Sequence, residues 1–182
     1  MAKIKTNPNP FQSENFETAF WEAQSFLIAA DAISKKAQFV LISEIVAKKG
    51  VDKSLGIQYA KEVNHAYAFE LLLKCIMIIE NGQYYSGHIL LDLFYKLNPD
   101  TQIKLSEIYK GCNHMRRHRT YFGIFEEVTL IMVLEEAKAA FKDLRYLFEG
   151  KNRPVYDLNL ALECLEFYIF ELRPELKLLK FS

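Results

Sequence analysis

One apolar seam near the start of the chain constrains the fold more than any other feature. Between residues 13 and 49, apolar side chains recur at alternating spacings of three and four residues, with one gap. They are Phe16, Phe20, Ala23, Leu27, Ala30, Ala37 and Leu41. This spacing predicts a long helix that packs one face against other helices. Gly50 follows two lysines, and both features suit the C-terminal end of that helix.

Gly and Pro number only twelve together, and they divide the rest of the chain into helical segments. The predicted helices span residues 57–80, 88–97, 100–109, 124–149 and 157–172. Asp100 and Asp157 are expected to cap the two helices that they begin. The segment "GCNHMRRHRTYFG" is either a loop or a continuation of the helix before it, and "PELKLLKF" adds a final turn or two. No segment alternates with period two for long enough to predict a strand.

These features predict an all-α fold, an antiparallel helical bundle with a long N-terminal helix. A chain of 182 residues fits one domain with a full hydrophobic core. Residues 1–12, which contain "NPNP", are expected to form an extended leader, and residues 13–182 the helical domain.

Charge and cysteine content set the expected environment. Lys and Arg balance Asp and Glu at 23 each, so binding to nucleic acid would need a local patch. Cys75, Cys112 and Cys164 are odd in number and widely spaced, which favours a reducing compartment. Cys75 and Cys164 lie in apolar helical settings and are expected in the core. The start of the chain has no signal-peptide core and no apolar run is long enough for a membrane span. We therefore expect a cytoplasmic protein without a membrane partner.

Metal and nucleophile patterns are weak. The pair Glu62 and His65 has metal-ligand spacing, but a di-metal bundle needs a second such motif. His114 and His118 lie one turn apart near Cys112, but the neighbouring arginines would repel a cation. No phosphate-binding glycine loop and no nucleophile elbow is present. We expect no metal, no cofactor and no catalytic residue.

The densest basic patch is "HMRRHRTYF". Arginine forks can hold phosphates, and aromatic rings such as Tyr121 can stack on unpaired bases. The candidates for RNA or phosphate binding are Arg116, Arg117, Arg119, His114, His118 and Tyr121. The alternative is a solvated loop whose cations stabilise the end of the preceding helix.

A second set of polar residues interrupts apolar helices. Glu70 and Lys74 lie one turn apart, either as a solvated pair on an outer helix face or as part of a functional cluster. Arg145 lies among apolar residues and needs a carboxylate, for which Glu149 and Glu70 are candidates.

In their order along the chain, these motifs resemble the HEPN family (higher eukaryotes and prokaryotes nucleotide-binding domain). The resemblance covers residues 57–172 and rests on Glu-x-x-x-Lys at Glu70 and Lys74, a Gly-His-x-Leu helix start at His88, and Arg-Tyr with a trailing acid at Arg145 and Glu149. It implies a helical bundle that dimerises and binds RNA or nucleotides. We expect His88 to head the third helix, tucked against the bundle with one ring nitrogen hydrogen-bonded, and Gly87 to allow the tight turn.

The resemblance carries over no catalytic residue. HEPN ribonucleases use an arginine followed, after four to six residues, by a histidine, and no arginine of this chain has that partner. The expected function is therefore non-catalytic binding of RNA, a nucleotide or a protein partner encoded nearby, by a homodimer in a toxin–antitoxin or phage-defence setting. The alternatives are a ribonuclease with a nonstandard His and Arg site, and a structural or antitoxin-type interaction module.

Overall fold

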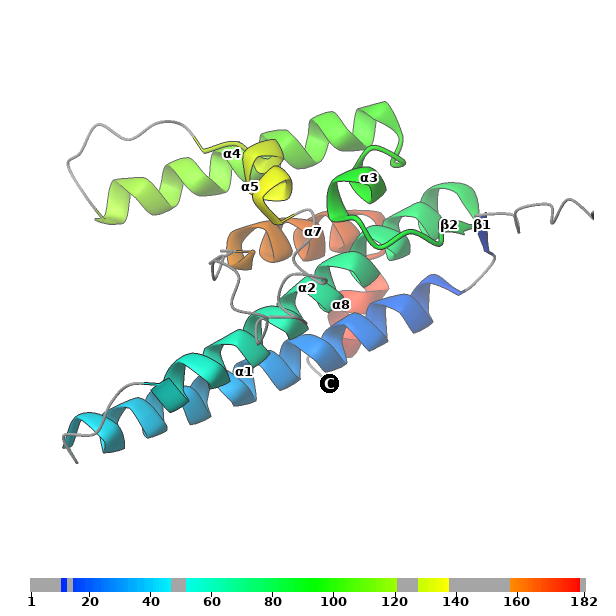
Figure 1. The fold of residues 1–182 in the computed structure, drawn as a ribbon. Coiled ribbons are helices and arrows are strands. Elements are labelled where there is room, and N and C mark those ends of the chain that lie inside the picture. The colour runs from blue at the N-terminus through cyan, green and yellow to red at the C-terminus, as the bar shows by residue number, and fades with distance from the viewer. Residues whose placement is uncertain (1–10, 13–14, 47–51, 121–127, 138–157, 181–182) are drawn as a thin grey trace, which may run out of the picture.

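The computed structural model describes residues 11–12, 15–46, 52–120, 128–137 and 158–180, and most of them are helical. The helices are α1 (Phe16–Val46), α2 (Asp52–Asn81), α3 (Leu90–Phe94), α4 (Pro99–Thr120), α5 (Leu130–Ala137), α7 (Asn159–Leu172) and α8 (Pro174–Lys180). Two strands of two residues each, β1 (Phe11–Gln12) and β2 (Tyr84–Tyr85), complete the described elements (Figure 1). The all-α fold class is confirmed.

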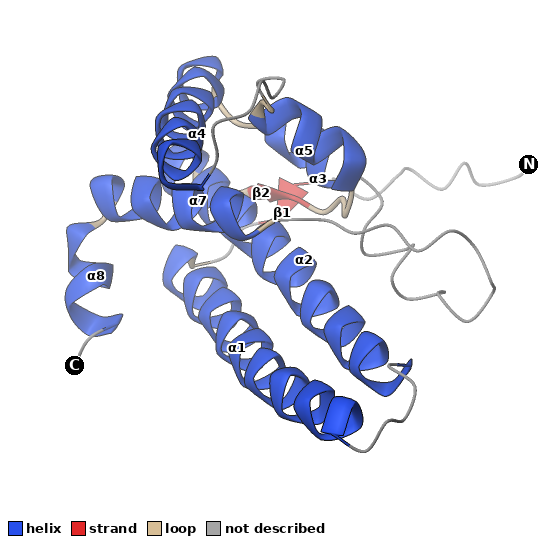
Figure 2. Cartoon of the chain, turned by 90° about the vertical axis from the view of Figure 1, so that its left-hand side faces the viewer, coloured by secondary structure: helices blue, strands red, loops and turns tan. Residues whose placement is uncertain are grey.

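The first two helices form a long hairpin whose far end extends away from the other helices (Figures 1 and 2). The apolar seam of α1 forms the inner face of this hairpin, because Phe20, Ala23, Ala30 and Ala37 are buried. Small side chains at three of these four positions allow the two helices to approach closely. Near its start, α1 is also tied to α7, since Gln24 Nε2 donates to Glu166 Oε1 at 2.6 Å.

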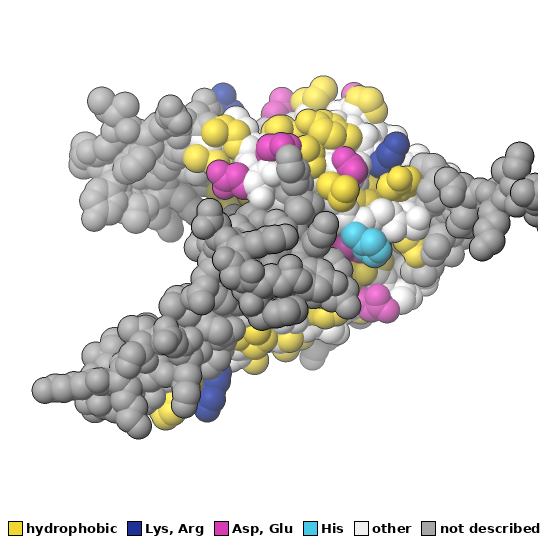
Figure 3. Space-filling model, in the orientation of Figure 1, with side chains coloured by type: hydrophobic (Ala, Val, Ile, Leu, Met, Phe, Trp, Pro, Cys, Tyr) yellow, Lys and Arg dark blue, Asp and Glu magenta, His cyan; other side chains and the backbone are white. Residues whose placement is uncertain are grey.

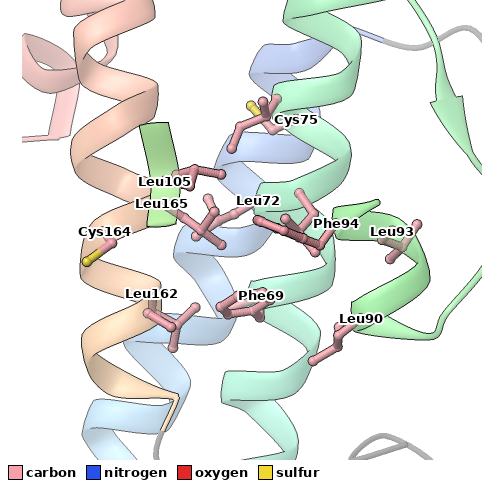
Figure 4. Packing of buried hydrophobic residues seen from close by; sticks show 14 of the residues in the cluster. Phe69, Leu72, Cys75, Leu90, Leu93, Phe94, Leu105, Leu162, Cys164 and Leu165 are labelled. Carbon is pink, nitrogen blue, oxygen red and sulfur yellow. The ribbon is translucent and has the colours of Figure 1, made fainter. Parts of the chain in front are cut away.

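The C-terminal half of α2 is the centre of the molecule. Every residue from Leu72 to Ile78 is buried, so this part of α2 is covered on all sides. Leucines from α3, α4 and α7 pack around it, together with Phe94 of α3 (Figure 4). Cys75 and Cys164 are buried in this core, as expected.

Gly82 ends α2 where the sequence predicted a stop. It adopts a positive φ of 70°, which glycine tolerates best, and its N–H donates to the carbonyl of Ile78 at 2.8 Å. The chain then forms β2, which pairs antiparallel with β1, so that Phe11 lies opposite Tyr85. The sequence indicated no strand at these positions, because a two-residue ladder is too short to show a period of two. Residues 1–10 of the expected leader lie outside the described part.

Several helix ends differ from the prediction. The fourth helix begins at Pro99, so Asp100 lies inside its first turn and is not the cap. Leu158 is the N-cap residue of α7, with no side-chain cap, and Asp157, the expected cap, lies outside the described residues. The helix expected over residues 124–149 is not continuous, because residues 128 and 129 are not helical and α5 begins at Leu130. Thr129 Oγ1 accepts the Met132 N–H at 3.2 Å at this start, and residues 124–127 and 138–149 lie outside the described part.

Glu80 near the end of α2 stabilises the start of α4. Its Oε2 accepts the Asn98 N–H at 3.1 Å and its Oε1 accepts a short hydrogen bond from the Thr101 hydroxyl. Thr101 Oγ1 also lies 3.0 Å from the Tyr168 hydroxyl of α7. The carboxylate therefore satisfies donors at the N-terminus of α4, and the Thr101 hydroxyl joins α2, α4 and α7. Among the described helices, none combines the length and the apolar character that a membrane crossing would require.

Candidate functional site

Glu70 and Lys74 form a buried ion pair in the middle of α2. Lys74 Nζ lies 2.7 Å from Glu70 Oε1, and the two residues are only 8% and 5% exposed. The reading of this pair as solvated on an outer face is therefore wrong, because α2 has packed neighbours on that side as well. A buried pair needs further hydrogen-bonding partners to offset the loss of hydration.

His88 is one such partner. Its Nδ1 lies 2.9 Å from the same Oε1 of Glu70, so a residue before α3 is tied to the middle of α2. Because an ionised carboxylate only accepts hydrogen bonds, Nδ1 is the nitrogen that carries a proton in this contact. The expected hydrogen bond at one ring nitrogen is present.

The position of His88 differs from the expectation in two respects. The helix begins at Leu90 with Ile89 as its N-cap, so His88 precedes the helix and does not head it. Its side chain is 65% exposed and is not tucked against the bundle. Figure 3 shows a histidine at the surface of this face, next to acidic side chains.

Aromatic rings from β2 complete this cluster of Glu70, Lys74 and His88, which we call the Glu70 cluster. The Tyr84 ring lies under Lys74, with Nζ 5.2 Å from the ring centroid. Gly87 leaves room for the Tyr85 ring: a Cβ there would lie 2.6 Å from Cε1 of Tyr85, so a larger residue would force that ring to shift. The cluster holds an exposed imidazole beside a buried carboxylate, an arrangement that fixes the ring orientation. Arg145 and Glu149, its other expected members, lie outside the described residues.

The basic segment after residue 110 is a continuation of α4 and not a loop, up to Thr120. Helical register separates its residues into two stripes. Positions 110, 114, 117 and 118 share the stripe of Ile103 and Glu107. Positions 116 and 119 share the stripe of Leu105 and Cys112 instead. Side chains from His114 to Thr120 are outside the described part, as is Tyr121.

A groove opens beside the first of these stripes. It has a volume of about 590 Å³ and lies between α4, the end of α3 and the start of α5. Its walls include Tyr95, Ile103, Ser106, Lys110 and Val128. On the face shown in Figure 3, hydrophobic side chains gather over these helices with charged side chains between them.

Sequence reasoning did not identify this groove. The spacing of Ile103, Glu107 and Lys110 by four and three residues was the available signal, because it marks one face of a helix. The other wall comes from Tyr95 and Val128, which are 33 residues apart, and nothing local in the sequence pairs them.

Three other titratable side chains lie in or near the core: Cys75, His65 and Glu62. Burial raises the pKa of the Cys75 thiol to about 12, and the positive charge of Arg173 opposes that shift. His65 Nδ1 and Glu62 Oε2 lie 3.7 Å apart. Within the described residues, no three His, Cys, Asp or Glu side chains come together as a metal site.

Comparison with known proteins gives no relative. No family model, no curated protein and no solved structure matches this chain.

Proposed function

We propose that this protein is a HEPN-like homodimer that binds single-stranded RNA or a nucleotide without cleaving it, in a toxin–antitoxin or phage-defence setting. The observation that carries the proposal is the continuation of α4 through the basic segment, beside the groove. Positions 110, 114, 117 and 118 then follow one another along the outer stripe of the same helix that forms the groove wall. Two cationic and two imidazole side chains in a row next to a partly apolar groove suit a phosphate backbone with unpaired bases.

The size and walls of the groove support this reading. Its volume of about 590 Å³ lies within the range of about 300–1,000 Å³ that small-molecule sites occupy. Tyr95 is exposed at its edge and offers an aromatic face on which a base can stack. Lys110 in the groove and Arg117 two turns further on are positioned in sequence to hold phosphates.

The Glu70 cluster has a structural role in this proposal. Lys74 and His88 both contact one oxygen of Glu70, and this holds the β2–α3 connection against α2. Without an arginine and histidine at the ribonuclease spacing, the protein binds RNA and leaves it intact. The rival structural or antitoxin-type role would instead use a protein partner, and RNA binding distinguishes the two.

The test is fluorescence anisotropy with a labelled single-stranded RNA over a series of salt concentrations. Lys110→Gln combined with Arg117→Gln should weaken binding about tenfold or more and reduce the salt dependence by about two phosphate contacts. The matched control is Arg116→Gln with Arg119→Gln, which removes two charges from the other stripe and should weaken binding less. Equal losses of affinity from both pairs would contradict the assignment of the phosphate contacts to the stripe of positions 110, 114, 117 and 118. A natural protein that binds no RNA would contradict the proposed function.

Cleavage is tested on the same RNA by gel electrophoresis. The proposal expects no cleavage above background, with or without added metal. Metal-independent cleavage that His118→Ala abolishes would establish the nonstandard ribonuclease instead.

A further inference from the structure

The outer face of α1 carries a second apolar stripe, opposite the seam that packs against α2. Ile28 and Phe39 are 70% and 67% exposed, and Trp21 lies on the same stripe. The positions recur at spacings of four, three, four, three and four residues: Trp21, Ser25, Ile28, Ala32, Lys35 and Phe39. This is the spacing of the core positions of a coiled coil, and it extends over about 27 Å at 1.5 Å per residue.

We propose that this stripe, which we call the α1 stripe, pairs antiparallel with the α1 stripe of a second copy of the chain. The inference rests on the proposed homodimer and names its interface. A two-fold axis near Ala30 would place Trp21 opposite Phe39 of the second copy and Ile28 opposite its Ala32. The apolar side chains at the two ends and the centre of the stripe then meet apolar partners, as an isologous interface requires.

Charges on the flank of the stripe fit the same arrangement. Glu22 and Lys36 occupy equivalent flanking positions two heptads apart, and both are exposed. In the antiparallel pair, Glu22 of each copy faces Lys36 of the other, which gives two ion pairs. A different partner would need apolar and charged residues at the positions that complement this stripe. A second copy of α1 already has them.

The parallel alternative fits less well. In-register parallel helices would bring Glu17 of one copy near Glu22 of the other, a repulsive contact. They would also place the two Lys35 side chains in the same core layer. In the antiparallel pair, Lys35 of each copy faces Ser25 of the other, and the two polar layers that result fix the register of the coiled coil. Lys35 already contacts Asp31 at 2.7 Å on the stripe edge.

The first test is light scattering of the full chain over a wide concentration range. The natural protein should be a dimer, and Ile28→Asp or Phe39→Asp should weaken association about 100-fold or more while circular dichroism shows the same helix content. The matched control is Phe167→Asp on α7, which is also an exposed aromatic residue but lies off the stripe. It should leave the dimer unchanged.

Charge exchange tests the direction of the pair, and it replaces only exposed residues. Glu22→Lys alone and Lys36→Glu alone should each weaken the dimer about tenfold, and the double exchange should restore it to within about threefold. A stronger dimer from Glu22→Lys would show a parallel pair and overturn the inference. A dimer that no α1 variant weakens would also overturn it while leaving the proposed homodimer intact. A natural protein that is monomeric at every concentration would overturn both the proposed homodimer and its α1 interface. RNA binding by that monomer would still support the proposed ligand.

Discussion

At the scale of single residues, one oxygen atom has both a buried and an exposed partner. Oε1 of Glu70 contacts the buried Lys74 ammonium and the largely exposed His88 ring. The two contacts differ in what their loss would leave behind. Without Lys74, a buried carboxylate loses the cation that balances its charge. Without His88, water can reach the vacated position because the ring already lies at the surface.

We therefore expect Lys74→Met to lower the free energy of unfolding by about 3–5 kcal/mol and His88→Ala by about 1 kcal/mol or less. Urea denaturation of the variants measures both changes. Lys104→Met is the control, since Lys104 and Glu171 form an exposed pair at 3.9 Å and its loss should change stability by less than about 1 kcal/mol. Equal losses from the Lys74 and His88 variants would show that the imidazole stabilises the fold as much as the ammonium.

The buried thiol of Cys75 should make the free energy of unfolding depend on pH. Its thiol has a pKa raised from about 9 to about 12 by burial, so the folded state keeps the proton that the unfolded chain releases. The stabilisation is fully present below pH 9 and is lost as the pH rises toward 12. Between these limits, the natural protein should lose up to about 1.4 kcal/mol per pH unit more than Cys75→Ala does. Denaturation curves at several pH values check this, and parallel pH profiles would contradict it.

At the scale of secondary-structure elements, the helices are joined by side chains at their ends as well as by apolar packing. Glu80 near the end of α2 accepts from Asn98 and Thr101 at the start of α4. Tyr168 of α7 contacts the same threonine hydroxyl. The buried hydroxyl of Thr101 is thus the point at which three helices meet.

Thr101→Val keeps the shape of the side chain but removes the hydroxyl. It should lower the free energy of unfolding by about 1–3 kcal/mol, because Glu80 and Tyr168 each lose a partner away from bulk water. Ser106→Ala on the same helix is the control. The Ser106 hydroxyl donates to the Gln102 carbonyl at 2.7 Å within the helix, and its removal should cost less. A Thr101 variant as stable as the natural protein in urea would show that Glu80 and Tyr168 find other partners.

At the scale of the whole molecule, the helical hairpin extends beyond the core that the other helices share (Figure 2). Apolar residues on its outer face, such as Ile28, remain exposed in a single chain. Covering them in a dimer would make folding depend on protein concentration, because only the folded chain presents the stripe.

The melting temperature of the natural protein should therefore rise as its concentration is increased about tenfold or more, by mass action. Ile28→Asp should abolish this dependence, and Phe167→Asp should retain it. Differential scanning calorimetry at several concentrations provides the measurement. A melting temperature that does not change with concentration in the natural protein would contradict a dimer linked to folding.

Much of the helical content followed from local patterns in the sequence. The seam of α1 predicted both its helix and its buried face, since Phe20 and Ala23 share one side of any helix with their spacing. Gly82 ended α2 as expected because a left-handed cap is a property of a few consecutive residues. The helix starts were less predictable. Glu80, far from Asn98 in sequence, accepts the backbone N–H just before α4, and Asp100 could not indicate that.

Two pairs with the same spacing separate the effect of local helical geometry from the effect of long-range packing. Asp31 with Lys35 and Glu70 with Lys74 are both acidic and basic residues one helical turn apart, and both form ion pairs at 2.7 Å. The sequence determined these contacts because helical geometry brings residues four apart together. Only the tertiary structure placed one pair in water and buried the other, since the helices that cover α2 come from distant parts of the chain. Burial depends on those distant neighbours, and no local pattern contains them.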